Sequence, residues 1–421
     1  MEFGPIVRAM WRNKVRFGLI VAEIALTLAI VANCVAMIVH ARDEMARPSG
    51  FDDESLLWVE ARHLDPAFRD EGRLDVSLRQ DAELLRSLPG VRAVMNTNFL
   101  PWNGGGSSTE LKPAGSSTLL RTQIYATDAS PSATLGVALE AGREFSAADV
   151  ERDTERLRAL FASARERDAE GKARERFLQE VVVTRAYAQL AFGEAPSYLG
   201  KLLEDSDGDR YQIVGVLDRF YNPYGWPIGE YAIFFANRGR SYEGGATFLV
   251  RVEPGQTAAV GRAIEERLAR PGEPREVRVR LITEVRDRYF GPQRIVATAM
   301  GGVIVLLVVV TALGIGGLTS FSVAERTRQI GTRRALGATT GAILRYFLLE
   351  NWLLTAAGLA LGVGLAVGLN VLLVSTVAGA KLRAGAVSLS MAALWAVGLG
   401  AALAPALRGA RTSPAVATRN V

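Results

Sequence analysis

The sequence has little of what a disulfide-stabilised protein or a metalloenzyme needs. Its 421 residues include one cysteine, two histidines and only 8% aromatic residues. A single cysteine excludes a disulfide within the chain and a cluster of thiolate metal ligands, and His40 and His63 are too few for the usual zinc sites. The sequence also lacks the HExxH and G-x-S-x-G motifs of zinc proteases and serine hydrolases. We therefore predict no catalytic site and no metal site on this chain.

A phosphate-binding loop is also missing. Gly200 and Lys201 resemble the end of such a loop, but Ala195 stands where its first glycine belongs. Leu202 follows the lysine in place of the serine or threonine that would contact Mg²⁺. We expect no cofactor on this chain, and no ATP bound through this motif.

Charge is scarce in four long apolar runs. They are residues 17–39, interrupted only by Glu23, and residues 295–324, 351–380 and 384–407. Each is long enough to cross a hydrocarbon core of about 30 Å, which takes roughly 20 helical residues. We predict four transmembrane α-helices, at 17–40, 295–321, 351–375 and 387–407.

The first run could instead be a signal peptide, because basic residues precede it. It is longer than the usual apolar core of a signal peptide, and no cleavage site precedes His40. A lipoprotein signal at Cys34 is disfavoured by Asn33 before it. We predict an uncleaved anchor, preceded at 1–16 by an amphipathic cytoplasmic helix. Glu23 would pair at a subunit interface or reach toward the inner surface.

Basic residues near the helix ends predict the topology. Twelve lie in the segments 1–16, 322–350 and 408–421, against two in the loop 376–386. The excess of positive charge on the cytoplasmic side places both termini and 322–350 in the cytoplasm, and residues 41–294 outside. The net charge of +5 divides into +10 outside residues 41–294 and −5 within them. We therefore do not expect a nucleic-acid partner.

The external segment has the composition of a soluble α+β domain. Short strand-like runs alternate with helical patterns, and Pro-Gly pairs mark turns between them. The strand-like runs are 56–59, 213–217 and 248–252, and the helical patterns are 81–88 and 257–268. Residues 151–180 are dense in Arg and Glu, which predicts a charged insertion forming a solvated helix, a helical hairpin or a partner-docking arm.

Residues 325–340 form the most distinctive segment. Glycines at 331 and 337 interrupt a basic and apolar helix directly after the second membrane span. This pattern predicts a short helix parallel to the membrane, with Gly337 ending it. Binding to anionic headgroups is one interpretation of such a loop.

The same segment resembles the signature of the FtsX/MacB-type permeases of bacterial ABC transporters, E-R-x-x-E-I-G-x-x-x-A-L-G-A. Gln329 departs from the usual glutamate. The pair Glu350-Asn351 is similar to the start of the family's third helix, and 405–414 to its P-A-R-x-A-x-x-x-P ending. Residues 126–145, 181–184 and 213–216 resemble the family's periplasmic core. The resemblance spans nearly the whole chain.

The resemblance implies a fold and a function. The fold would be four membrane helices with a large MacB-like extracytoplasmic α+β domain between the first two, in the bacterial inner membrane. The chain would be a permease subunit that pairs with a second permease, identical or related, in the lipid bilayer. It would bind two copies of an ABC ATPase, which hold ATP and Mg²⁺. Since only sixteen residues precede the first helix, we expect the ATPase on another polypeptide.

The family's cytoplasmic signature forms the coupling helix that contacts the ATPase. By resemblance its residues here are Glu325, Arg326, Arg328, Gln329, Ile330, Gly331, Arg334, Ala335, Leu336, Gly337 and Ala338. ATP hydrolysis would move the external domain to export or extract a substrate from the periplasmic side. A periplasmic adaptor or lipoprotein is a further candidate partner. The alternative is a signalling subunit that regulates a cell-envelope enzyme.

Small residues predict a close helix contact in the third span. Gly358 and Gly362, and Gly364 and Gly368, are each four residues apart. Such spacing lets helix backbones approach closely, although it also arises by chance in glycine-rich helices. We assign these four glycines to a membrane-helix interface.

Overall fold

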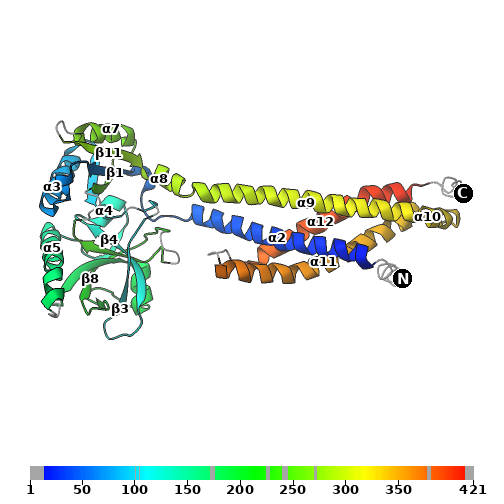
Figure 1. Ribbon diagram of the computed structural model, residues 1–421, viewed down its shortest axis with the longest axis horizontal. Coiled ribbons are helices and arrows are strands. Elements are labelled where there is room, and N and C mark those ends of the chain that lie inside the picture. The colour runs from blue at the N-terminus through cyan, green and yellow to red at the C-terminus, as the bar shows by residue number, and fades with distance from the viewer. Residues whose placement is uncertain are drawn as a thin grey trace. The chain divides into compact units, whose positions relative to one another are not determined.

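The computed structural model describes residues 14–99, 101–103, 105–170, 176–223, 228–238, 245–269, 273–376 and 381–412. The chain divides into two compact units. The helical unit comprises Met1–Ala46 and Pro292–Val421, and the α/β unit comprises Arg47–Gly291 (Figure 1). Of the predicted amphipathic helix at 1–16, residues 1–13 lie outside the described residues, and 14–16 begin the first membrane helix.

Four apolar helices long enough to cross a membrane form the helical unit, with one short helix between the second and third. They are α2 (Lys14–Ala46), α9 (Gly291–Glu325), α10 (Thr327–Ala335), α11 (Thr340–Thr376) and α12 (Ala384–Ala410). The four candidate spans have mean hydropathies of 1.8 to 2.6. Four apolar helices with a large mixed domain between the first two confirm the predicted fold class.

The long helices extend past the predicted spans. Helix α9 has 35 residues, which at 1.5 Å per residue is about 52 Å, well beyond the hydrocarbon thickness. Sequence reasoning ended the first span at His40, before the first charge, whereas α2 remains helical through Arg42 and Asp43. Charged residues at the ends of a membrane helix are compatible with helical backbone, so the charge boundary is not the helix boundary.

Helix α2 packs deeply within the helical unit. Its buried side chains Ile24 and Leu28 share one apolar cluster with residues of α9, α11 and α12. The Thr27 hydroxyl lies 2.9 Å from the Thr311 hydroxyl of α9. Asn33 Nδ2 donates to the carbonyl of Ala366 in α11 at 3.1 Å. Thr27 and Asn33, two polar side chains inside the bundle, thus bond to neighbouring helices.

Two sheets form the α/β unit. The smaller has four antiparallel strands in the order β11-β1-β10-β2. Helices α3 and α7 cover one face, where alternate strand residues such as Val59 and Phe248 are buried against them. The bounds are β1 (Leu56–His63), β2 (Val91–Asn96), β10 (Gly245–Val252), β11 (Arg275–Leu281), α3 (Glu71–Ser87) and α7 (Thr257–Leu268).

The larger sheet is mixed, with seven strands in the order β5-β8-β6-β9-β4-β3-β7. Its strands are β3 (Ser108–Pro113), β4 (Leu120–Thr127), β5 (Leu139–Gly142), β6 (Leu178–Thr184), β7 (Leu202–Glu204), β8 (Arg210–Leu217) and β9 (Ala232–Ala236). Helix α6 (Arg185–Phe192) packs on one face through Tyr187 and Ala188. Helix α5 (Ala147–Glu170) lies beside the same sheet (Figure 1). The short helices α4 (Pro131–Leu135) and α8 (Ile282–Tyr289) complete the unit.

The prediction of a solvated arm at 151–180 is wrong at both ends of that range. Helix α5 begins at Ala147, and Asp153 and Thr154 are buried. Leu178 already belongs to strand β6. The charges of the first turns pair inward: Glu151 accepts from Arg79 of α3 at 2.7 Å. A charged sequence can pack against a domain when the domain supplies the opposite charges.

The two ends of the α/β unit adjoin each other. Strands β1 and β11 are antiparallel neighbours, with Leu57 opposite Leu281. Beyond them, Arg286 of α8 forms an ion pair with Asp53 at 2.6 Å and donates to the carbonyl of Arg47 at 2.9 Å. The chain therefore enters and leaves this unit at the same place.

Candidate functional site

The short helix α10 is produced by a break on each side. After α9, Arg326 leaves the helical conformation with φ −103° and ψ 12°. After α10, Gly337 adopts φ +95°, the left-handed region that glycine reaches without strain. The amides of Gly337 and Ala338 then donate to the carbonyls of Arg334 and Arg333, at 3.1 and 3.0 Å. This glycine cap ends the helix where the sequence predicts.

One side of α10 is buried in the helical unit. Ile330 is 5% exposed and shares a cluster with Ile343 and Phe347 of α11 and with Ala406 and Ala410 of α12. Gly331, the next residue, is also buried. The apolar cluster holds α10 against two membrane helices, so its movement is tied to theirs.

Three arginines fix the ends of this segment. Arg326 contacts Glu350 of α11 at 3.0 Å and the hydroxyl of Tyr346 at 3.2 Å. Glu325 accepts from Arg16 of α2 at 3.1 Å. Arg334 donates to the carbonyl of Thr412, after α12, at 2.6 Å. The segment from Glu325 to Arg334 is thus attached to α2, α11 and the end of α12.

The other side of α10 is exposed. Its exposed residues include Arg328, Gln329, Arg333, Ala335 and Leu336. Leu336 is 83% exposed, the largest value among the exposed large apolar side chains of the described residues. An exposed leucine can insert into an apolar pocket of a partner protein, and the arginines beside it can pair with acidic residues around that pocket.

The structure therefore separates the eleven predicted coupling residues into four groups. Arg328, Gln329, Ala335 and Leu336 face outward, and Ile330 and Gly331 face the bundle. Glu325, Arg326 and Arg334 make the polar attachments, and Gly337 and Ala338 form the cap.

Sequence reasoning missed the partners of these residues. Tyr346 was not singled out, Arg16 was counted only among the basic residues before the first span, and Glu350 was noted only as the start of a helix. Glu350 in fact lies inside α11, which begins at Thr340. A carboxylate at the edge of an apolar run needs a cation nearby, but residues 322–350 contain five arginines and the sequence does not choose among them.

The four interface glycines fall into two pairs. A Cβ on Gly358 would come within 2.7 Å of Ile24 Cβ, and one on Gly362 within 2.9 Å of the Ala25 carbonyl oxygen. Gly358 and Gly362 thus allow α11 to approach α2 of the same chain. Cβ atoms on Gly364 and Gly368 would meet nothing within 4 Å among the described residues.

Glu23 lies between two helices. A Cβ on Gly314 of α9 would come within 2.7 Å of its carboxylate oxygen Oε2. The carboxylate therefore contacts the backbone of α9 at a glycine, where no side chain displaces it.

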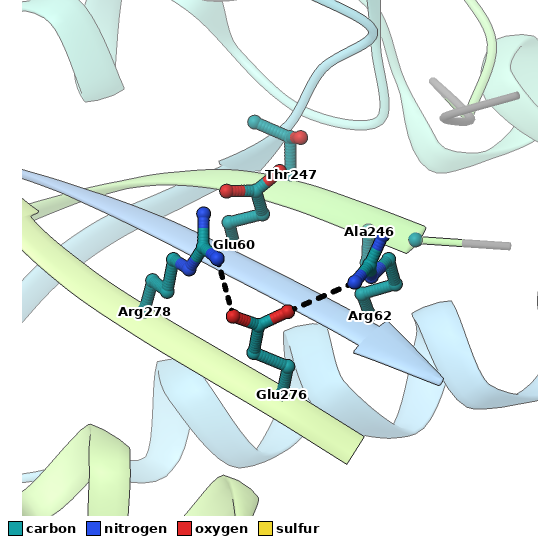
Figure 2. Close-up of a pocket in the computed structure, with 7 residues that line it drawn as sticks. Glu60, Arg62, Ala246, Thr247, Glu276 and Arg278 are labelled. Carbon is teal, nitrogen blue, oxygen red and sulfur yellow. Dashed lines mark hydrogen bonds and ion pairs between the residues drawn. The ribbon is translucent and has the colours of Figure 1, made fainter. Parts of the chain in front are cut away.

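A charged groove in the α/β unit is a second candidate (Figure 2). It is a cavity of about 90 Å³ on the smaller sheet, lined mainly by β1, β10 and β11. Arg62 and Glu276 stand directly opposite in the register, as do Glu60 and Arg278. Both arginines donate hydrogen bonds to the Glu276 carboxylate. The hydrogen bond from Arg278 is the main reason that the pKa of Glu276 is lowered. Opposite charges across neighbouring strands stabilise the sheet, so this groove has a structural explanation.

Comparison with known proteins connects the helical unit to a family. Residues 301–414 match the family model described as the FtsX-like permease C-terminal. The chain is 41% identical over 85 residues to the uncharacterized ABC transporter permease YknZ of Bacillus subtilis, which is 20% of this chain and 21% of that protein. It is 31% identical over 175 residues to the macrolide export ATP-binding/permease protein MacB of Syntrophobacter fumaroxidans, covering 40% of this chain and 24% of that protein.

Two solved structures show a distant likeness. The periplasmic region of MacB from Actinobacillus actinomycetemcomitans has a TM-score of 0.34 at 10% identity, covering 58% of this chain and 97% of that one. The extracellular domain of YknZ from Gram-positive bacteria has a TM-score of 0.29 at 13% identity, covering 52% and 99%.

Four apolar helices, a basic helix between the second and third, and an α/β domain between the first two define a multi-pass membrane protein with an extracytoplasmic domain. Residues 301–414 match the FtsX-like permease C-terminal family, and the chain is similar to the permeases MacB and YknZ over the stretches given above. The matched stretches make up less than a quarter of the length of YknZ and MacB.

Proposed function

We propose that this chain is the membrane subunit of an ABC transporter and that α10 is its contact with the ATPase. The observation that supports this most directly is the exposed side of α10, where Leu336 and Arg333 project from a helix attached to α2, α11 and α12. A partner ATPase, in two copies, binds ATP and Mg²⁺ and pushes on this side. The relatives support the assignment, since MacB is named an ATP-binding/permease protein.

The movement would pass from α10 into the membrane helices and on to the extracytoplasmic domain. Arg326 and Arg16 join the segment to α11 and α2, and α2 continues to Ala46, next to the α/β unit in the chain. Work done on the external domain would export or extract a substrate from the periplasmic side. A second permease, identical or related, and an adaptor or lipoprotein would complete the assembly.

Loss of ATPase contact tests the proposal. We expect Leu336→Asp and Gly337→Pro to abolish co-purification of an ABC-type ATPase with the full chain and the ATPase activity of the complex. Leu119→Asp is the matched control, because Leu119 is an exposed leucine of the α/β unit. Full ATPase binding by both α10 variants, with unchanged ATP-driven activity, would refute the assignment.

The same proposal places both termini and α10 in the cytoplasm of a bacterial inner membrane. In a Cys34→Ser background, Ala335→Cys and Ser117→Cys place single thiols on α10 and in the α/β unit. A membrane-impermeant maleimide added to intact spheroplasts should label position 117 and spare position 335 until the membrane is opened. Equal labelling of both before opening would contradict this topology.

A further inference from the structure

The larger sheet contains a cavity of about 320 Å³ beneath helix α5. Leu157 and Leu160 of α5 form one wall, and strands β4, β6, β8 and β9 form the floor. The volume is at the lower end of the range for small-molecule sites. The cavity is lined by Asn98, Ile124, Tyr125, Ala126, Leu157, Leu160, Phe177, Gln179, Asp205, Tyr211, Phe235 and Asn237.

The floor is aromatic and held in place. The rings of Tyr211 and Phe235 meet edge to face with centroids 5.5 Å apart, and Phe177 meets Tyr211 in the same way at 6.1 Å. The Tyr211 hydroxyl donates to Asp205 Oδ2 at 2.8 Å. Rings fixed at right angles offer both a face and an edge, which is the arrangement that a further aromatic ring prefers.

The two charged side chains at the cavity already have contacts within the domain. Asp205 accepts from Tyr211 and from the backbone amides of Asp207 and Asp209, both at 2.9 Å. The guanidinium of Arg156 lies over the ring of Phe177, 4.8 Å from its centroid. Apart from Asp205, the side chains that line the cavity are uncharged, so a charged ligand buried among them would lose its hydration, and the site favours an uncharged one.

One polar atom in the lining is left over. Asn237 Oδ1 is buried and has no hydrogen-bond partner among the described residues. The neighbouring polar groups have theirs: Asn98 Oδ1 accepts from the amide of Ala126 at 2.8 Å, and Gln179 donates to Asp153 at 3.3 Å. A buried acceptor without a donor is costly, and a donor on a ligand would remove that cost.

We propose that this cavity binds an uncharged aromatic small molecule with one hydrogen-bond donor. Its rings lie between α5 and the rings of Tyr211 and Phe235, and its N–H or O–H donates to Asn237 Oδ1. The site belongs to the α/β unit alone and does not depend on the proposed ATPase coupling. Binding is therefore expected without ATP and without the ATPase.

The probe is N-phenyl-1-naphthylamine, an uncharged aromatic amine with a single N–H whose fluorescence rises in apolar surroundings. It is titrated into the full chain in lipid nanodiscs, and the signal of protein-free nanodiscs is subtracted. We expect a saturable component for the wild type and at least a ten-fold higher Kd for Leu157→Arg. Leu190→Arg, an exposed leucine of α6 that receives the same charge, is the matched control and should bind as the wild type does.

The hydrogen bond is tested separately. Asn237→Leu should weaken binding of the amine probe about five-fold, the usual contribution of one neutral hydrogen bond. Asn237→Asp keeps an acceptor and should bind the probe more tightly than Asn237→Leu. Displacement by 1-phenylnaphthalene, which has no donor, should be unchanged by Asn237→Leu. Circular dichroism and the melting temperature of each variant report folding. The proposal is overturned by the absence of a saturable component, by wild-type affinity in Leu157→Arg, or by wild-type affinity in Asn237→Leu.

Discussion

Arg326 donates to both carboxylate oxygens of Glu350, at 3.0 and 3.3 Å. Glu350 is 4% exposed at its side chain and Arg326 is 18% exposed. The pair joins the residue between α9 and α10 to the interior of α11. Because Arg326 directly precedes α10, the pair links the start of α10 to α11.

The first prediction concerns this pair. Glu350→Gln and Arg326→Gln should each destabilise the chain by about 3 kcal/mol, because each leaves one partly buried charge without its partner. The melting temperature in detergent measures the change. The double variant should lose less stability than the sum of the losses in the two single variants. Arg328→Gln, on the exposed side of α10, is the control with little expected effect, and equal effects of all three single variants would argue against a special role for the pair.

The second prediction separates the two glycine pairs. Gly362→Leu should lower the melting temperature strongly, because a Cβ there would meet the Ala25 carbonyl oxygen at 2.9 Å and Leu28 Cβ at 3.0 Å. Gly364→Leu has space within the chain and should leave the melting temperature of the isolated subunit unchanged. If a second permease packs on that side, Gly364→Leu should instead reduce the dimer fraction seen by cross-linking. A larger thermal effect at 364 than at 362 would contradict the contact with α2.

The third prediction is a pH dependence at the start of α5. Burial alone would raise the pKa of Asp149, but the bonds from Ser146 and the guanidinium of Arg143 outweigh it and lower the pKa to about 2. Since the folded pKa lies below the unfolded value, the stabilisation of about 2 kcal/mol is present above pH 4 and is lost as the pH falls toward 2. Asp149→Asn should remove it at neutral pH, while the difference from the wild type shrinks in acid. Unfolding by guanidinium at pH 7 and pH 3 measures this.

The fourth prediction concerns a buried pair between the two sheets of the α/β unit. Arg238, after β9, contacts Asp75 of α3 at 2.5 Å, and both side chains are buried. Burial alone would raise the pKa of Asp75, but the hydrogen bonds and charges of Arg238 and Arg79 outweigh burial. The pKa of Asp75 therefore lies below its ordinary value. Arg238→Met should cost about 3 kcal/mol at neutral pH, and the loss should lessen at acid pH, where Asp75 becomes protonated. A loss that is independent of pH would assign the effect to packing alone.

Much of the membrane layout could be predicted from the sequence, because a membrane-spanning helix needs a long apolar run and such runs are conspicuous. The cap at Gly337 was equally accessible, since few residues other than glycine adopt its backbone conformation without strain. The pairing of Arg326 with Glu350 could not be predicted, because it depends on how α9 and α11 pack and not on any local pattern. The two glycine pairs have the same spacing, and only the position of α2 distinguishes them.

Helix α5 shows where charge patterns mislead. Its composition favours a solvated helix, yet Asp153 and Thr154 are buried. The two arginines that pair with Glu151 come from α3 and from the end of β9, far away in the sequence. The cavity below α5 was hidden for the same reason, because its lining comes from four strands and a helix that meet only in the folded domain.

Because β1 and β11 are neighbours, the α/β unit is an insertion that begins and ends at one place in its fold. Its first and last strands are hydrogen-bonded neighbours, so a short linker could replace the whole unit without separating α2 from α9 along the chain. The same property would let unrelated external domains be exchanged on one membrane scaffold.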